Sequence, residues 1–175
     1  MSAQFAEKAR LHADEIMVGD AEHLIDTAFE GRRFDVILCL DVIEHMVDPW
    51  RFVSTLPRLL APAGMVILSI PNVHNLAVTL PLIVRGQWQY QDEGLLDRTH
   101  LRFFTRESAL ELASIPPLQV QKLIRTLPTA PSTLRLLHRF SFGLVDDLFA
   151  IQFLIASRLM PVTAPEFRAS TEGDG

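Results

Sequence analysis

Two runs of apolar residues dominate the hydrophobic pattern of the chain, an uninterrupted one at positions 36–40 and one at 65–70 that is broken only by Ser69. Such runs are typical of parallel strands covered on both faces. Between them, Asp48 followed by Pro49 predicts a helix start, because the aspartate caps free N–H groups and proline needs none in the first turn. We expect this helix to reach about residue 60, with a kink at Pro57. Strand, helix and strand at this spacing predict a crossover unit of an α/β sheet.

Shorter patterns on either side predict the remaining elements. Helices are expected over residues 3–14, 21–28, 76–84 and 106–113, and strands over 15–19, 118–126 and 148–159. The last two strands are joined without a crossover helix, which indicates an antiparallel hairpin at one edge of the sheet. The basic stretch 134–140 between them is open to three interpretations, namely an amphipathic surface anchor, a lid on the substrate side, or a packing element.

The predicted fold class is therefore α/β, with a mostly parallel Rossmann-like sheet and an antiparallel C-terminal hairpin. Residues 1–160 form one domain in this interpretation, and residues 161–175 form a disordered tail. A hydrophobic fraction of 49% and a charged fraction of 21% are those of a folded domain.

Charge and composition exclude several classes of function. A net charge of −5 argues against binding to a nucleic-acid backbone. Cys39 is the single cysteine, so no internal disulfide can form, and its apolar neighbours predict a buried, inert thiol. The charged N-terminus does not resemble a signal peptide, and no apolar run approaches the roughly 20 residues that span a bilayer. We therefore expect a cytoplasmic protein with no membrane span.

Five short segments follow one another along the chain. They are Val-Gly-Asp-Ala-Glu at 18–22, Phe-Asp-Val-Ile-Leu-Cys-Leu-Asp-Val-Ile-Glu-His at 34–45, Asp-Pro at 48–49, Leu-Ala-Pro-Ala-Gly at 60–64 and Ser-Ile-Pro-Asn at 69–72. Each is weak alone, but together their order and spacing resemble the middle and end of class I S-adenosylmethionine-dependent methyltransferases, over about residues 3–159. A sixth segment, Leu-Asp-Arg-Thr-His-Leu-Arg-Phe-Phe-Thr at 96–105, is similar to a subgroup with small-molecule or glycan-type acceptors.

The resemblance implies S-adenosylmethionine as cofactor and assigns residues to it by position. Asp20 matches the acid that accepts from the adenine amino group, with Ala21 beside it, although Asp20 also suits the cap of the following helix. Leu40 and Asp41 match positions at the methionine and sulfonium end. The same pocket wall is implied to continue through Val42 and His45, and the acceptor is implied to border Ile70, Pro71 and Asn72.

Methyl transfer mainly requires alignment of acceptor, methyl group and sulfur. A base is needed only for a hydroxyl or a protonated amine, and the candidate catalytic residues are His45, Asp97 and His100. A purely structural role is the alternative for each candidate. Glu44 and His45 could form a surface pair, and Asp97 and His100 could form a local hydrogen bond. No ligand cluster has the close spacing of a metal site, so none is predicted. Trp88 and Tyr90 are candidates for an aromatic wall at the acceptor site.

The resemblance also identifies two features that this sequence does not contain. The family has a glycine-rich turn after its first strand and a ribose-binding acid after its second, but this sequence has neither, and no G-x-G precedes the strand at 36–40. We therefore expect an N-terminally truncated domain lacking two strands. The strand at 36–40 would then be an exposed edge, unless a second copy or partner chain pairs with it or the 15–19 strand moves beside it.

The sequence thus predicts methyl transfer to a small-molecule, lipid-linked or glycan-type acceptor. The alternative is a catalytically silent module that pairs with a partner subunit, or with a second copy, through its open sheet edge.

Overall fold

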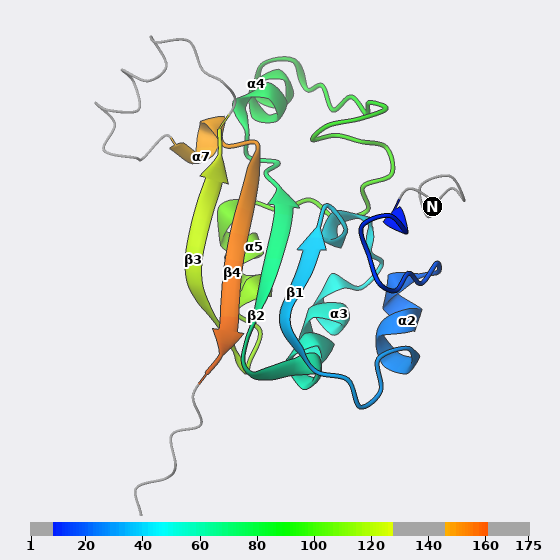
Figure 1. The fold of residues 1–175 in the computed structure, drawn as a ribbon. Helices are drawn as coiled ribbons and strands as arrows, with labels where there is room; N and C mark the ends of the chain where they lie inside the picture. The colour runs from blue at the N-terminus through cyan, green and yellow to red at the C-terminus, as the bar shows by residue number, and fades with distance from the viewer. Residues whose placement is uncertain (1–8, 128–145, 161–175) are drawn as a thin grey trace, which may run out of the picture.

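The computed structural model describes residues 9–127 and 146–160 (Figure 1). Its helices are α2 (Ala21–Thr27), α3 (Pro49–Thr55), α4 (Leu76–Arg85), α5 (Arg106–Ala113) and α7 (Asp146–Phe149), with 3-10 turns η1 (Ile43–His45) and η2 (Leu56–Leu59). The strands are β1 (Phe34–Leu40), β2 (Leu60–Pro71), β3 (Leu118–Thr126) and β4 (Gln152–Leu159).

The four strands form one mixed sheet in the order β1-β2-β4-β3. β1 runs parallel to β2, while β4 runs antiparallel to both β2 and β3. This arrangement confirms the α/β class and the C-terminal hairpin. The sheet register places Cys39, Leu68, Ile155 and Leu123 in one row across the four strands.

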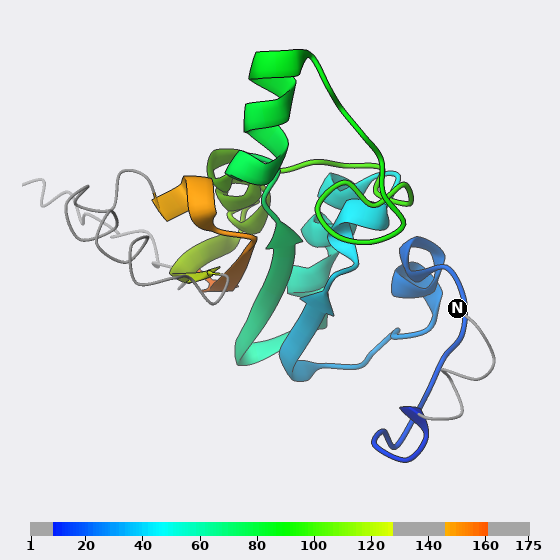
Figure 2. The ribbon, with the colours of Figure 1, turned by 90° about the horizontal axis from the view of Figure 1, so that it is seen from above.

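Helices cover one face of the sheet, as the view from above shows (Figure 2). Leu68 on β2 and Phe153 on β4 are fully buried in the same cluster as Phe52 of α3 and Leu112 of α5. Cys39 of β1 belongs to this cluster, and burial raises the pKa of its thiol to about 12. The core therefore lies in a single layer between the sheet and its helices.

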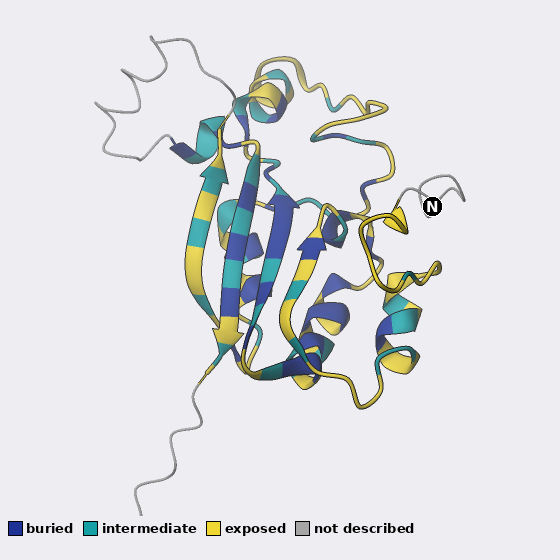
Figure 3. Ribbon diagram, viewed as in Figure 1, coloured by how far each residue is buried: buried dark blue, intermediate teal, exposed yellow. Residues whose placement is uncertain are grey.

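None of the described helices packs on the opposite face of the sheet, called the open face below, so within the described residues the expectation that β1 is covered on both faces is wrong. Val36, Leu38 and Leu40 alternate with the core-facing residues of β1 and have 49%, 58% and 47% of their surface exposed. Figure 3 shows most of β1 in the colour of exposed residues. Apolar runs reveal that a strand lies within a sheet, but not whether anything packs on its second face. β1 is also an edge of the sheet, as expected, since β2 is its one partner among the described residues.

The predicted strand at 15–19 is not formed. Residues 15–19 are irregular, and all but half-buried Ile16 are exposed. An isolated apolar run becomes a strand only when a neighbour satisfies its backbone groups, and no described strand lies beside it. Residues 10–12 of the predicted helix 3–14 form a turn. Residues 1–8 of that helix, the stretch 134–140 and the tail 161–175 lie outside the described residues.

Local signals placed the helix boundaries well. The Asp48 side chain accepts from the Arg51 N–H at 3.0 Å and caps α3, and the helix passes into η2 just before Pro57. Thr105 caps α5 in a capping box, and Gly86 ends α4 in the left-handed conformation. Across residues 9–127 and 146–160, no helix is long and apolar enough to traverse a bilayer.

Candidate functional site

A cavity of about 340 Å³ lies beyond the carboxyl ends of β1 and β2. Asp41 follows β1, Pro71 ends β2, and Gln152 begins the antiparallel β4 at the same edge of the sheet. The carboxyl edge of parallel strands is where ligands bind in α/β sheets. The cavity lining comprises Asp41, Glu44, His45, Pro71, Gly94, Leu95, Asp97, His100, Ile151 and Gln152.

The segment from residue 86 to 104 arches over this edge of the sheet (Figure 1). It is tied down at η1, because the N–H groups of Leu101 and Arg102 donate to the Glu44 carbonyl at 2.8 and 3.0 Å. This attachment brings Asp97 and His100 to the cavity that Glu44 and His45 also line. The structure therefore gathers four of the sequence-predicted residues, namely Asp41, His45, Asp97 and His100, around one cavity.

The His45 ring is held by the arching segment. Its Nδ1 lies 3.1 Å from the Thr99 carbonyl oxygen and 3.2 Å from the Thr99 hydroxyl. The backbone N–H and the hydroxyl of Thr99 both donate to Asp97 Oδ1 at 2.7 Å. These hydrogen bonds hold the pKa of Asp97 below its ordinary value. Asp97, Thr99 and His45 thus form a continuous hydrogen-bonded chain.

The second imidazole, His100, is buried beside the first. The two rings meet edge to face with centroids 4.8 Å apart. His100 Nδ1 lies 3.3 Å from the Leu95 carbonyl, and its Nε2 lies 4.0 Å from Glu44 Oε1. Burial raises the pKa of Glu44 and lowers that of His100. Both shifts favour the neutral forms of the pair, and Glu44 Oε2 has no hydrogen-bond partner among the described residues.

Asp41 turns the chain out of β1 in an unusual backbone conformation, with φ at +52°. Left-handed φ values are costly for most side chains and tolerated by aspartate. Its Oδ1 accepts from the Ser69 hydroxyl at 3.2 Å and from the Gln152 amide. Residues on three neighbouring strands or their ends thus fix the Asp41 carboxylate at the mouth of the cavity.

The remaining cofactor candidates lie at different places in the structure. Ala21 and Val42 line a second, mostly apolar cavity of about 470 Å³ that also contains Phe29, Phe34 and Phe52. Asp20 caps α2, its Oδ1 accepting from the Glu22 N–H at 2.9 Å, and it lines neither cavity. Leu40 lies on the open face of the sheet.

The chemistry of the two cavities matches the two ends of S-adenosylmethionine. The aromatic side chains of the second cavity suit the flat adenine, while the polar cavity suits the charged methionine end and the acceptor. Consecutive residues line the two, since Asp41 lines the polar cavity and Val42 the apolar one. The six cofactor residues predicted from the sequence therefore remain a prediction, with Asp41, His45, Ala21 and Val42 the best placed.

A donor set that could hold a metal ion is also present at the polar cavity. Glu44, His45 and His100 each offer one ligand atom, and these atoms lie within 4.8 Å of one another. Spacing along the chain gave no sign of it, because 55 positions separate the two histidines.

Four residues of the site were not identified as site residues from the sequence. Glu44 is only 2% exposed, whereas one interpretation of the sequence placed it in a surface pair with His45. Ser69 meets Asp41 through the parallel pairing of Leu40 with Ser69, and Gln152 through the antiparallel pairing of β4 with β2, and no local pattern predicts either register. Thr99 lies between Asp97 and His100, so its position in the loop was the available signal.

The sequence matches a family model described as "Methyltransferase domain" over residues 5–114. A ubiquinone biosynthesis O-methyltransferase from Neisseria meningitidis is 31% identical over 146 residues, covering 76% of this chain and 61% of that protein. The mitochondrial protein of the same name from Arabidopsis thaliana is 43% identical over 72 residues, covering 37% and 21%. The chain thus spans at most about three fifths of these two relatives.

Solved methyltransferase structures share the fold. A SAM-dependent methyltransferase from Thermotoga maritima superposes with a TM-score of 0.61 at 17% identity, covering 91% of this chain and 70% of that one. A Haloferax volcanii protein solved in complex with the Trm112 methyltransferase activator gives 0.55 at 14% identity, with the same coverage of 91% and 70%. At these identities the likeness concerns the fold alone.

Proposed function

Since the chain belongs to the methyltransferase domain family, we propose that it transfers a methyl group from S-adenosylmethionine to a hydroxyl group of a small-molecule acceptor. The relatives are named for O-methyl transfer, and a hydroxyl acceptor is one of the two cases, with a protonated amine, in which an enzyme needs a base. The observation that carries the proposal is the meeting of Asp41, His45, Asp97 and His100 around one cavity at the carboxyl edge of the parallel strands.

S-adenosylmethionine, consumed as a co-substrate, would supply the methyl group on a sulfonium that is already an excellent leaving group. The residues of this chain would then have two tasks. Asp41, fixed by Ser69 and Gln152, would face the charged methionine end. An imidazole in the polar cavity would accept the hydroxyl proton, and alignment of the reactants would supply much of the remaining rate.

The acceptor we favour is an aromatic hydroxyl compound. Phe103 contacts Trp88 with ring centroids 5.2 Å apart, Tyr90 at 6.4 Å and the cavity residue His100 at 6.3 Å. This cluster joins the cavity to the partly exposed rings of Trp88 and Tyr90, which offer apolar faces to a flat acceptor. The same faces also suit a sugar ring, so a glycan-type acceptor is the second candidate.

The catalytically silent module is not supported by the relatives, which are named as enzymes. Pairing of the open β1 edge with a second copy or a partner chain remains compatible with methyl transfer. A cytoplasmic location stays a prediction from the sequence.

The first experiment is calorimetric titration of the chain with S-adenosylhomocysteine, alongside Asp41→Ala and the control Asp26→Ala. Asp26 lies at the other end of the sheet, so its variant should bind as the wild type does. Binding that Asp41→Ala weakens at least about tenfold would support the proposal. A folded wild-type chain without binding, or equal binding by both variants, would contradict it. Activity assays with a soluble catechol and a soluble hexose derivative then separate the two acceptor classes.

A further inference from the structure

The two histidines of the polar cavity differ in how many of their nitrogens are already engaged. His100 is buried, with one nitrogen near the Leu95 carbonyl and the other directed toward Glu44. His45 is exposed to the cavity and uses only Nδ1, since its Nε2 has no hydrogen bond to any residue that the structure describes. A histidine that acts as a base needs one nitrogen held and the other free.

Hydrogen counting on Thr99 determines which His45 nitrogen carries the proton. The Thr99 carbonyl can only accept. Its hydroxyl has a single hydrogen, which is donated to Asp97 Oδ1 at 2.7 Å. A carboxylate accepts and has no hydrogen to return. Both oxygens that face His45 Nδ1 must therefore act as acceptors, so Nδ1 must be the donor.

We propose that Thr99 is a positioning residue that holds His45 as the Nδ1–H tautomer, which makes Nε2 the base that takes the acceptor's proton. This inference rests on the proposed methyl transfer to a hydroxyl. Asp97 acts one step further out, by engaging the Thr99 hydroxyl hydrogen. The arrangement follows the general rule that a third group orients a catalytic base.

The chemistry balances without a further reactant. The acceptor hydroxyl gives its proton to His45 Nε2, and an oxygen lone pair forms the new bond to the methyl carbon. The bond from carbon to sulfur breaks with its electron pair returning to sulfur, which turns the sulfonium into a neutral thioether. The imidazolium then releases the proton to water, and the Nδ1 hydrogen stays on the ring throughout.

His100 is poorly suited to the same task. The Leu95 carbonyl requires a hydrogen on His100 Nδ1, so the lone pair on Nε2 is directed toward Glu44. Glu44 Oε1, at 4.0 Å, is the acidic group nearest to that nitrogen, so His100 Nε2 does not face a free part of the cavity as His45 Nε2 does. The charged or titratable groups that line the cavity around His45 are Asp41, Glu44, Asp97 and His100.

The test is nitrogen NMR of the 15N-histidine-labelled chain, without cofactor and with a chelator present. Neutral imidazole nitrogens differ strongly in shift according to whether they carry hydrogen, so the tautomer is read directly. We expect Nδ1–H in the wild type and in Thr99→Ser, which keeps the hydroxyl. Thr99→Val removes one acceptor, and Asp97→Ala frees the hydroxyl to donate to the ring. Both variants should raise the Nε2–H fraction.

Steady-state kinetics provide the second readout. Thr99→Val should lower kcat about 10-fold or more, with KM for S-adenosylmethionine unchanged, and Thr99→Ser should restore the rate. A wild-type His45 with hydrogen on Nε2, or a Thr99→Val variant with wild-type tautomer and kcat, would overturn the inference. Because the tautomer is read without cofactor, that failure is distinct from absent methyl transfer, which would overturn the proposed function and the base role with it.

Discussion

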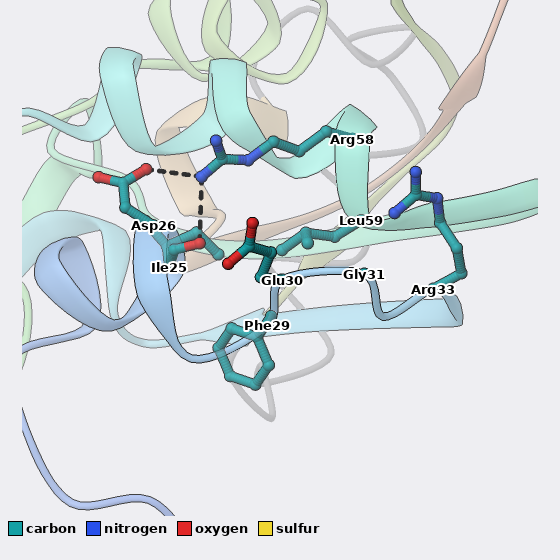
Figure 4. A pocket seen from close by; sticks show the side chains of 8 residues that line it. All are labelled: Ile25, Asp26, Phe29, Glu30, Gly31, Arg33, Arg58 and Leu59. Carbon is teal, nitrogen blue, oxygen red and sulfur yellow. Dashed lines mark hydrogen bonds and ion pairs between the residues drawn. The ribbon is translucent and has the colours of Figure 1, made fainter.

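Charged side chains gather at both ends of the parallel strand pair, but they differ between the two ends in burial and in how well they are paired. At the amino end, Asp26 of α2 bonds to Arg51 of α3 at 2.7 Å and to Arg58 of η2 at 2.6 Å. Figure 4 shows Arg58 also reaching the Ile25 carbonyl, at 3.1 Å. These groups are solvent-exposed, and the two guanidinium groups hold the pKa of Asp26 below its ordinary value.

At the carboxyl end, the charged and titratable groups are less well paired. Glu44 and His100 are buried, their pKa values are shifted toward the neutral forms, and Glu44 Oε2 has no partner in the described part of the chain. Buried, poorly satisfied polar groups cost stability, whereas exposed ion pairs cost little and contribute little. The amino end therefore fastens α2 to α3, and the carboxyl end retains groups whose cost is consistent with a chemical role.

The largest expected effect is on catalysis at the carboxyl end. His45→Ala should lower kcat for methyl transfer by about 10² to 10⁴, because the proposed base is lost. Its unfolding midpoint in urea should stay near that of the wild type, since His45 is exposed and lies outside the core. Asp26→Ala, at the amino end, should leave kcat unchanged. Equal loss of activity in both variants would remove the contrast between the ends.

Replacing Glu44 should raise the stability of the fold and lower its activity. Glu44→Gln removes a buried titratable group while keeping its size, so the free energy of unfolding at pH 7 should rise by about 1 kcal/mol. Methyl transfer should fall, because the neighbour of His100 has changed. Urea unfolding and initial rates measure both quantities. A less stable variant with full activity would show that Glu44 serves the fold.

The two ends should also respond to pH with opposite signs. The pKa of Asp26 is lowered from 3.8, so its contribution to stability is complete above that value and lost as the pH falls through the folded pKa. The pKa of Glu44 is raised from 4.5, so its contribution is complete below that value and lost as the pH rises through the folded pKa. The urea midpoint should be measured as a function of pH for both variants. Asp26→Asn should reduce the fall of the midpoint toward acid pH, and Glu44→Gln should reduce its fall as the pH rises.

The smallest effect is expected from the amino-end ion pairs at neutral pH. Arg58→Met keeps the length of the side chain but removes its bonds to Asp26 and the Ile25 carbonyl. We expect a slight fall in melting temperature by calorimetry and no change in affinity for S-adenosylhomocysteine. A weaker affinity in this variant would mean that the two ends are coupled through α2.

The sequence was most informative where structure is decided locally. Asp48 and Pro49 marked the start of α3, because a helix cap depends on a few adjacent residues. The open face of β1 could not be predicted, since Leu38 is equally apolar whether or not a helix packs against it. The 15–19 run has the composition of a strand but lacks a neighbouring one.

The candidate site was predicted in part for a related reason. Side chains that follow strands, such as Asp41, or that lie in the loop above them, such as His100, could be assigned from the order of elements. The contact between Gln152 and Asp41 depends on the antiparallel register of β4 and joins residues 111 positions apart. The burial of Glu44 depends on the arching segment that folds back over η1.

The thiol of Cys39 gives this chain a built-in probe of motion next to the site. It is the single cysteine, it faces the core from the edge strand β1, and only 4% of its surface is exposed. Alkylating reagents attack the thiolate, and the buried thiol has a pKa of about 12, so modification requires β1 to separate from its helices. The labelling rate therefore reports how often the strand that carries Asp41 opens, and a ligand held by Asp41 should slow it.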